Sequence, residues 1–112
     1  MRIWDIEPRL LCRQHLLGEH RELHAIWNII TKNKRGYSKH PEVLRWRGKL
    51  SALDYRHDEL VREMLVRGYK HNSSLCFVKP TELDVSYIQD EFVNSREEQI
   101  SILRAKKCEC AV

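Results

Sequence analysis

Apolar residues recur at helical spacing along two long stretches of the chain, and this periodicity constrains the fold more than any other feature. The longer stretch begins at Pro41 and ends at Gly68, and the residues in helical register are Val43, Leu44, Leu50, Leu53, His57, Leu60, Val61, Met64 and Leu65. Steps of three and four residues bring side chains to one face of a helix. Proline suits the first helical turn and glycine the end, so the sequence predicts a helix over residues 41–68.

A second periodic stretch lies nearer the amino terminus. Its apolar residues are Leu16, Leu17, Leu23, Ile26, Trp27 and Ile30. With Pro8 in the first turn, this pattern predicts a helix over about residues 8–32. Ser95 followed by Glu98 is a capping-box pattern and predicts a shorter helix over about residues 96–106. We therefore expect an all-α fold of two long helices and one shorter C-terminal helix, with the apolar N-terminal segment packed against them.

Length and charge restrict the organisation further. A chain of 112 residues has the size of a single domain, which we expect to span residues 1–112. Lys and Arg number 20 against 16 Asp and Glu, a mild basic excess that is compatible with nucleic-acid binding. No stretch is apolar enough for a signal peptide or a membrane span. The sequence thus predicts a cytoplasmic protein that does not bind membranes.

The cysteines and histidines do not show the usual spacing of a metal site. Cys12, Cys76, Cys108 and Cys110 lack a CxxC pair, and the last two are one residue apart near the end of the chain. His20 and His24 are four apart and could chelate an ion from one helix face, but no third ligand follows at a convincing spacing. A paired Glu-x-x-His pattern is also missing. We therefore expect no metal and no cofactor.

Ionisable side chains interrupt the apolar pattern between residues 14 and 24. At about 100° per residue, His15, Glu19 and Glu22 fall on roughly one side of the helix, with Arg21 beside them. A carboxylate next to an arginine and a histidine suits proton transfer on an anionic substrate. On the residues alone, the pattern favours a surface carboxylate at Glu22 that is paired with a nearby arginine.

A basic loop follows this helix. It contains Lys34 and Arg35, which either contact DNA phosphates or form a solvated loop. Trp46, among basic residues near the start of the next helix, either stacks on a base or belongs to the core.

Two blocks of sequence resemble a known family. Residues 14–23, QHLLGEHREL, are similar to the QHL-x-x-E-x-REL signature in the first long helix of the pyrimidine-dimer DNA glycosylases, the phage endonuclease V family. The second block comprises Lys49, Leu50, Leu53, Arg56, Glu59, Leu60, Leu65, Arg67, Gly68 and Tyr69, and resembles the family's K-L-x-x-L…R…E-L…L-x-R-G-[FY] helix end. The resemblance covers roughly residues 1–72.

This resemblance implies a fold and a mechanism. The fold is all-α, with the N-terminal segment threaded back against the long helices. The nucleophile is the α-amine of the first residue, here Met1, and its acid/base partner is Glu22. By the same matching, Arg2, Arg21 and His15 contact or orient the substrate. The implied activity is that of a DNA glycosylase with AP-lyase activity on damaged double-stranded DNA, through an imine.

The chain departs from the family pattern at three places. Met1 takes the position of a small threonine, Ala25 stands where the family has a basic residue, and the aromatic, basic C-terminal tail is absent. The last departure affects the choice of lesion, which the sequence leaves open between pyrimidine dimers, oxidised bases and abasic sites. The alternative function is a non-catalytic, basic helical module that binds nucleic acid or a protein partner.

Overall fold

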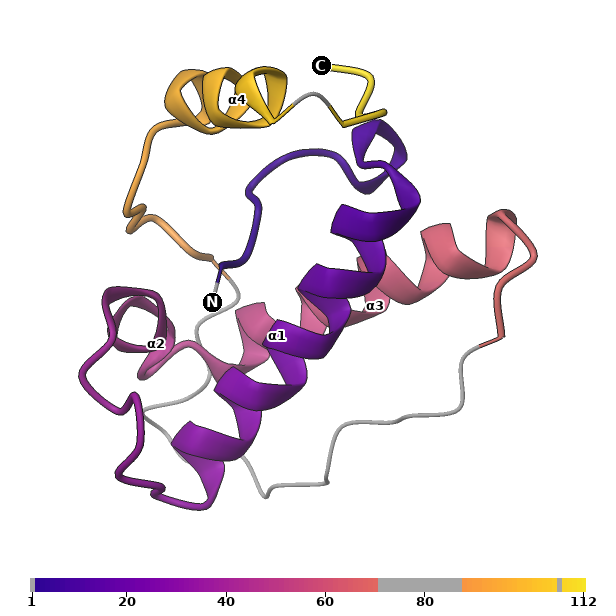
Figure 1. Cartoon of the computed structure of the whole chain (residues 1–112). Coiled ribbons are helices and arrows are strands. Elements are labelled where there is room, and N and C mark those ends of the chain that lie inside the picture. The colour runs from indigo at the N-terminus through magenta and orange to yellow at the C-terminus, as the bar shows by residue number, and fades with distance from the viewer. Residues whose placement is uncertain (1, 71–87, 107) are drawn as a thin grey trace.

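The computed structural model describes residues 2–70, 88–106 and 108–112, and the regular elements within these ranges are all helical. In chain order they are η1 (Pro8–Leu10), α1 (Arg13–Thr31), α2 (Pro41–Trp46), α3 (Leu50–Val66) and α4 (Arg96–Ala105) (Figure 1). The expected all-α class is confirmed, with α1 and α3 as the two long helices.

The core forms where α1 and α3 pack against each other. Leu16, Leu23 and Ile26 of α1 are fully buried, as are Leu53 and Leu60 of α3. These residues are the ones that the sequence periodicity assigns to the inner faces, so burial of the apolar stripes explains the pairing of the two helices. Trp46 also lies in the core, with 2% of its surface exposed, and so does not offer a face for base stacking.

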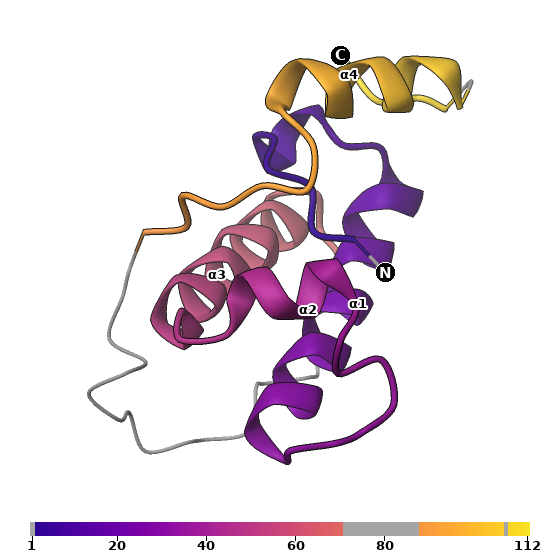
Figure 2. The same ribbon diagram turned by 90° about the vertical axis from the view of Figure 1, so that its left-hand side faces the viewer.

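The N-terminal segment packs against the helices, as expected. Ile3, Trp4 and Ile6 are buried. Figures 1 and 2 both show this segment between α4 and the α1–α3 pair. It therefore forms part of the core rather than a frayed terminus.

The predicted helix over residues 8–32 is wrong in its first turn. Residues Pro8–Leu10 form a 3-10 turn, after which Leu11 and Cys12 are extended and α1 begins at Arg13. The guanidinium of Arg67 donates hydrogen bonds to the carbonyl oxygens of Pro8 and Leu11 at 3.1 and 2.6 Å. These distant donors satisfy the carbonyl groups of the turn, so the chain bends there and buries Leu11 in the core.

The predicted helix over residues 41–68 is also divided in two. α2 ends at Trp46 and α3 begins at Leu50. Between them Gly48 has a φ of 75°, in the left-handed region that glycine adopts without a steric cost. Gly68, with a φ of 80°, follows the end of α3 in the same conformation, as the sequence predicts.

The capping box of α4 is confirmed. The Ser95 hydroxyl accepts a hydrogen bond from the Glu98 amide at 3.1 Å, and the Ser95 amide donates to the Glu98 carboxylate at 3.0 Å. After α4 the chain turns back, and the Ala111 amide donates to the carbonyl of Leu10 at 2.7 Å. The C-terminal residues thus lie beside the start of α1. None of the helices described combines the length and apolar character needed to cross a membrane.

Candidate active site on the first long helix

A pocket of about 250 Å³ lies between the N-terminal segment and the outer face of α1. Its lining residues are Arg2, Trp4, Gln14, His15, Gly18, Glu19, Arg21 and Glu22. Four of the predicted site residues therefore meet in one place: Arg2, His15, Arg21 and Glu22. Helical spacing predicts that His15, Arg21 and Glu22 lie near one another on α1, whereas Arg2 lies in the pocket because the N-terminal segment packs against this helix.

Arg2 is fixed at the edge of this pocket by two contacts. Its guanidinium donates a hydrogen bond to the Asn94 side chain at 2.8 Å and lies 4.9 Å from the centre of the Trp4 ring. A cation held over an aromatic face keeps its charge available to an anionic ligand. Sequence reasoning missed Trp4 and Asn94, since neither belongs to the motif on α1.

His15 stands beside Trp4, with ring centres 5.7 Å apart in an edge-to-face arrangement. Burial lowers the pKa of His15, and nearby Lys106 lowers that pKa further. The neutral imidazole is therefore favoured, in which one ring nitrogen donates a hydrogen bond and the other accepts one.

A buried ion pair holds the N-terminal segment next to the pocket. The Arg56 guanidinium donates to both carboxylate oxygens of Glu19, at 2.7 and 3.1 Å. It also donates to the carbonyl oxygens of Trp4 and Ile6, and the Trp4 amide donates to Glu19 at 2.8 Å. Burial raises the pKa of Glu19, while Arg56 and the Trp4 amide oppose that shift. Glu19 and Arg56 thus join α1, α3 and the N-terminal segment.

A second buried arginine binds the same segment from α2. Arg45 donates to the carbonyl oxygen of Ile3 at 3.1 Å and to both oxygens of the Asp5 carboxylate, at 3.3 and 3.1 Å. Glu42 accepts a hydrogen bond from the same guanidinium at 2.6 Å. Residues 3–6 are therefore held by polar contacts as well as by their apolar side chains.

Glu22 and Arg21 are the two charged side chains of the pocket that make no polar contact within the described residues. Glu22 is half-buried and Arg21 exposed. Within the part of the chain that the structure describes, neither side chain forms an ion pair or a hydrogen bond. The hypothesis that Glu22 is merely paired with a nearby arginine therefore finds no partner among these residues.

The remaining predicted site residues lie elsewhere. Lys34 and Arg35 are exposed in the turn after α1, and neither lines the pocket. Met1, the predicted nucleophile, lies outside the described residues.

Three clusters of metal-binding residue types occur within the described ranges. One of them, formed by Asp54, His57 and Asp58, lies along α3, and sequence spacing did not reveal the other two. The first of these two clusters contains His20 and His24 of α1 and His57 of α3, which is the third histidine that spacing did not provide. The Nε2 atom of His20 lies 3.3 Å from Nε2 of His24 and 3.3 Å from Nε2 of His57. The second cluster contains His15 and three cysteines. Both clusters join residues far apart in sequence, so neither has a short motif.

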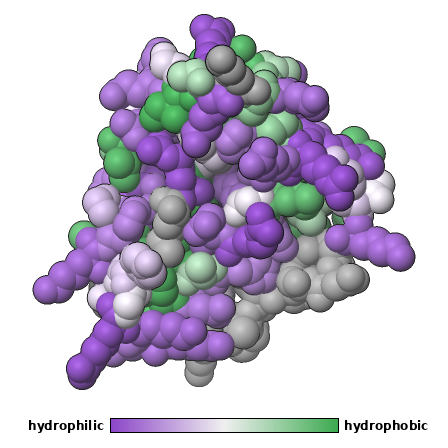
Figure 3. Space-filling view, viewed as in Figure 1, coloured by the Kyte–Doolittle hydropathy of each residue, from purple (hydrophilic) through white to green (hydrophobic). Residues whose placement is uncertain are grey.

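The surface around α1 is polar. The face viewed in Figures 1 and 3 is mostly hydrophilic, and hydrophobic side chains appear there only in scattered groups. A polar face with exposed arginine and lysine side chains suits contacts with phosphates better than the burial of an apolar partner.

Comparison with known proteins assigns the chain to a family. The family model described as pyrimidine dimer DNA glycosylase matches residues 1–76, which include the N-terminal segment, α1, α2 and α3. No match was found among curated proteins or among solved structures. Since the matched residues make up more than half of the 112, the chain belongs to the pyrimidine dimer DNA glycosylase family.

Proposed function

We propose that this protein is a DNA glycosylase with AP-lyase activity that acts through an imine between the α-amine of Met1 and C1′ of a damaged nucleotide. One observation carries the proposal. Arg2, the covalent neighbour of Met1, lines the same pocket as Glu22, Arg21 and His15. Consecutive Cα atoms are about 3.8 Å apart, so a chain that starts at Met1 carries its amine within one residue of this pocket.

The amine is suited to nucleophilic attack. An α-amino group has an ordinary pKa of about 7.7–8.0, so a substantial neutral fraction exists at physiological pH, in contrast to lysine near 10.4. Attack of the amine on C1′ displaces the base, and the C1′–O4′ bond of the sugar then breaks, with O4′ taking up a proton, to give the imine. At an abasic site the amine condenses with the C1′ aldehyde of the open sugar, which gives the imine and releases water. This step needs the sugar to be extruded from the duplex.

Glu22 is the proposed acid/base group. The imine acidifies the C2′ proton, which the carboxylate of Glu22 removes. The electron pair of that C–H bond forms the C2′=C3′ double bond, and the C3′–O bond breaks to release the 3′ phosphate. The same carboxylate stabilises the positive charge that develops at C1′.

The basic residues hold the DNA in this scheme. Arg2 and Arg21 bind the phosphates that flank the lesion, where the planar guanidinium donates two parallel hydrogen bonds. Lys34 and Arg35 are proposed to contact phosphates further along the duplex, because both are exposed on the loop after α1. The substrate is damaged double-stranded DNA, with pyrimidine dimers and abasic sites as the two candidate lesions.

Borohydride reduction during incision of an abasic-site duplex tests the proposal. Tag-free protein is expected to form a stable covalent adduct and to cleave the strand. A form extended at its amino terminus should do neither, and Glu22→Gln should cleave far more slowly. Glu97→Gln, which changes an exposed carboxylate of α4, is the matched control and should behave as wild type. Incision that the extended form retains in full would reject the amine, and binding without incision would leave a nucleic-acid-binding module.

A further inference from the structure

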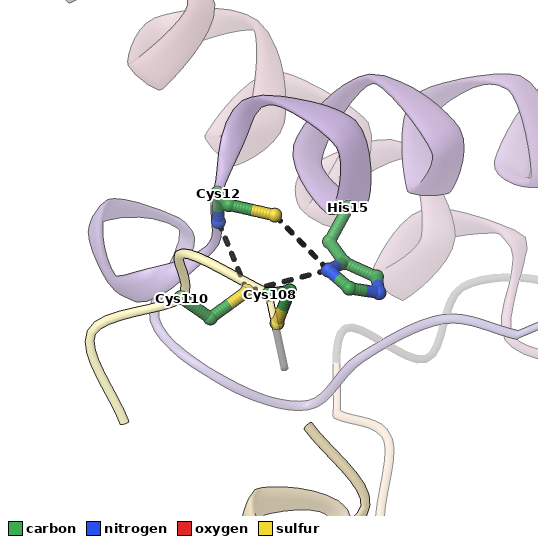
Figure 4. A group of neighbouring side chains, drawn as sticks. All are labelled: Cys12, His15, Cys108 and Cys110. Atoms are coloured by element: carbon green, nitrogen blue, oxygen red, sulfur yellow. Dashed lines mark hydrogen bonds between the residues drawn. The ribbon is translucent and has the colours of Figure 1, made fainter. Parts of the chain in front are cut away.

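Four side chains from the two ends of the chain meet beside the start of α1. Cys12 is the N-cap of that helix and His15 lies in its first turn, whereas Cys108 and Cys110 come from the segment after α4 (Figure 4). One potential ligand atom from each residue lies within 4.8 Å of all the others. The Nδ1 atom of His15 is 3.1 Å from Cys12 Sγ and 3.3 Å from Cys110 Sγ.

Three thiols and one imidazole are a donor set of structural zinc sites. Tetrahedral zinc with Zn–S near 2.3 Å and Zn–N near 2.0 Å places sulfur and nitrogen about 3.5 Å apart. The observed separations of 3.1 and 3.3 Å differ from this value by only a few tenths of an ångström. We propose that Cys12, His15, Cys108 and Cys110 bind one zinc ion.

The backbone around the cluster supports such a site. Cys12 precedes the first residue of α1 and His15 lies in the first turn, and their side chains are in contact, with Cys12 Sγ 3.1 Å from His15 Nδ1. The Cys12 amide donates a hydrogen bond to Cys110 Sγ at 3.0 Å, an outer contact that stabilises a thiolate ligand. The hydrogen bond from the Ala111 amide to Leu10 sets the register of the C-terminal residues.

An ion can reach the cluster from solvent. All four side chains are half-buried, and the three described cysteines form no disulfide. A neighbouring hollow of about 540 Å³ includes Cys12 and Cys108 in its lining. Zinc binding would release the protons of the three thiols.

The proposed zinc site extends beyond the part of the chain that matches the family model. The family match ends at residue 76, so two of the four ligands lie beyond it. A bound zinc would tie the C-terminal segment to α1. The pairing of chain ends also explains why spacing alone gave no metal site: the two halves of the donor set are more than 90 residues apart.

The zinc would also orient His15. Its Nδ1 atom faces the sulfur atoms, and its Nε2 atom lies on the far side of the ring from the three cysteines (Figure 4). With Nδ1 bound to zinc, the proton resides on Nε2, so His15 becomes a fixed donor. His15 also lines the pocket with Glu22. This positioning role rests on the proposed DNA chemistry, whereas zinc binding does not.

Metal content and a cobalt spectrum test the site. The full chain is purified under reducing conditions without a metal-affinity tag, and zinc is measured by mass spectrometry. We expect about one zinc ion per chain, and its binding should depend on the four residues. Replacement by Co²⁺ should give the sulfur-to-cobalt charge-transfer absorption of a tetrahedral thiolate site. A folded wild-type chain without this absorption would overturn the proposal, as would a disulfide between these cysteines under the same conditions.

Variants separate this cluster from the three histidines. Cys108→Ser and Cys110→Ser should each weaken the charge-transfer band, because each removes one of the three thiolate ligands, and should lower zinc affinity by roughly tenfold or more. His24→Gln, in the other cluster, should leave the band unchanged and serves as the matched control. Cys110 lies in the C-terminal segment, so its variant remains informative even if Cys12→Ser fails to fold. A band of unchanged intensity in both tail variants would refute the site.

A separate readout tests the orientation of His15. In nitrogen-15 NMR spectra of the zinc-bound protein, His15 should show the tautomer with the proton on Nε2. An Nδ1-protonated His15 would overturn the positioning role. The outcome of this spectrum does not depend on whether the protein incises DNA, so a failure here is distinct from a failure of the proposed enzyme.

Discussion

Removal of Arg56 should destabilise the protein strongly. The guanidinium makes four hydrogen bonds, two to Glu19 and one each to the carbonyl oxygens of Trp4 and Ile6. Arg56→Met keeps much of the side-chain volume but leaves the Glu19 carboxylate, 2% exposed, without its counter-charge. Breaking a buried ion pair in this way costs about 3–5 kcal/mol. That loss is a large part of the 5–15 kcal/mol that stabilises a typical small domain.

Urea unfolding followed by tryptophan fluorescence measures the effect, because Trp4, Trp27 and Trp46 are all buried. Arg62→Met on the exposed side of α3 is the matched control and should change the unfolding free energy by less than about 0.5 kcal/mol. The double variant Arg56→Met with Glu19→Leu should be more stable than Arg56→Met alone, since it removes the unpaired charge as well.

The loss of unfolding free energy in Arg56→Met, here called the deficit, should depend on pH in a definite direction. Burial raises the pKa of Glu19 even beside Arg56, and loss of the guanidinium raises that pKa further. A carboxyl group whose folded-state pKa is above its unfolded value destabilises the fold as pH rises past the unfolded pKa. The deficit should therefore shrink as the pH is lowered from 7 towards about 4. An Arg56→Met protein as stable as Arg62→Met at pH 7, or a deficit that grows in acid, would refute the role of this pair.

Three further changes have predicted outcomes. Ser95→Ala removes the cap of α4 and should lower the unfolding free energy by about 1 kcal/mol in urea titrations; no change would show that this cap does not stabilise the fold. Arg21→Gln should reduce the slope of log binding constant against log salt concentration by about 1 for an abasic duplex, and an unchanged slope would exclude a phosphate contact. Glu22→Gln should slow strand cleavage by about 10²–10⁴-fold. Its thermal unfolding should match wild type, because Glu22 has no side-chain partner among the described residues, and a large loss of stability would assign it a structural role instead.

The sequence predicts the helices better than their ends. Apolar spacing identified the inner faces of α1 and α3, and the Ser95 capping box marked the start of α4. Gly48 is a local indication of the break between α2 and α3, but the apolar spacing continues across it and therefore predicts one uninterrupted helix. The break before α1 had none, because the donor that satisfies the carbonyl groups of the turn is Arg67, more than 50 residues away.

The sequence likewise predicts some residues of the candidate site and misses others. Helical geometry places His15, Arg21 and Glu22 on one side of α1, and the structure adds Arg2 through the packing of the N-terminal segment. The sequence motifs contain Glu19 and Arg56 but do not show that they pair, since their contact crosses 37 residues. Local spacing predicts no metal site, because spacing cannot show that Cys12 and Cys110 meet.

Peptide mapping of the reduced protein–DNA adduct identifies the atom that attacks the sugar. Tag-free protein, with its first residue verified by intact mass, is trapped with borohydride on an abasic-site duplex and digested with a protease. We expect the residual sugar to be attached to the α-amine of Met1. Attachment to a lysine side chain, or no adduct from a protein with an unblocked amino terminus, would contradict it.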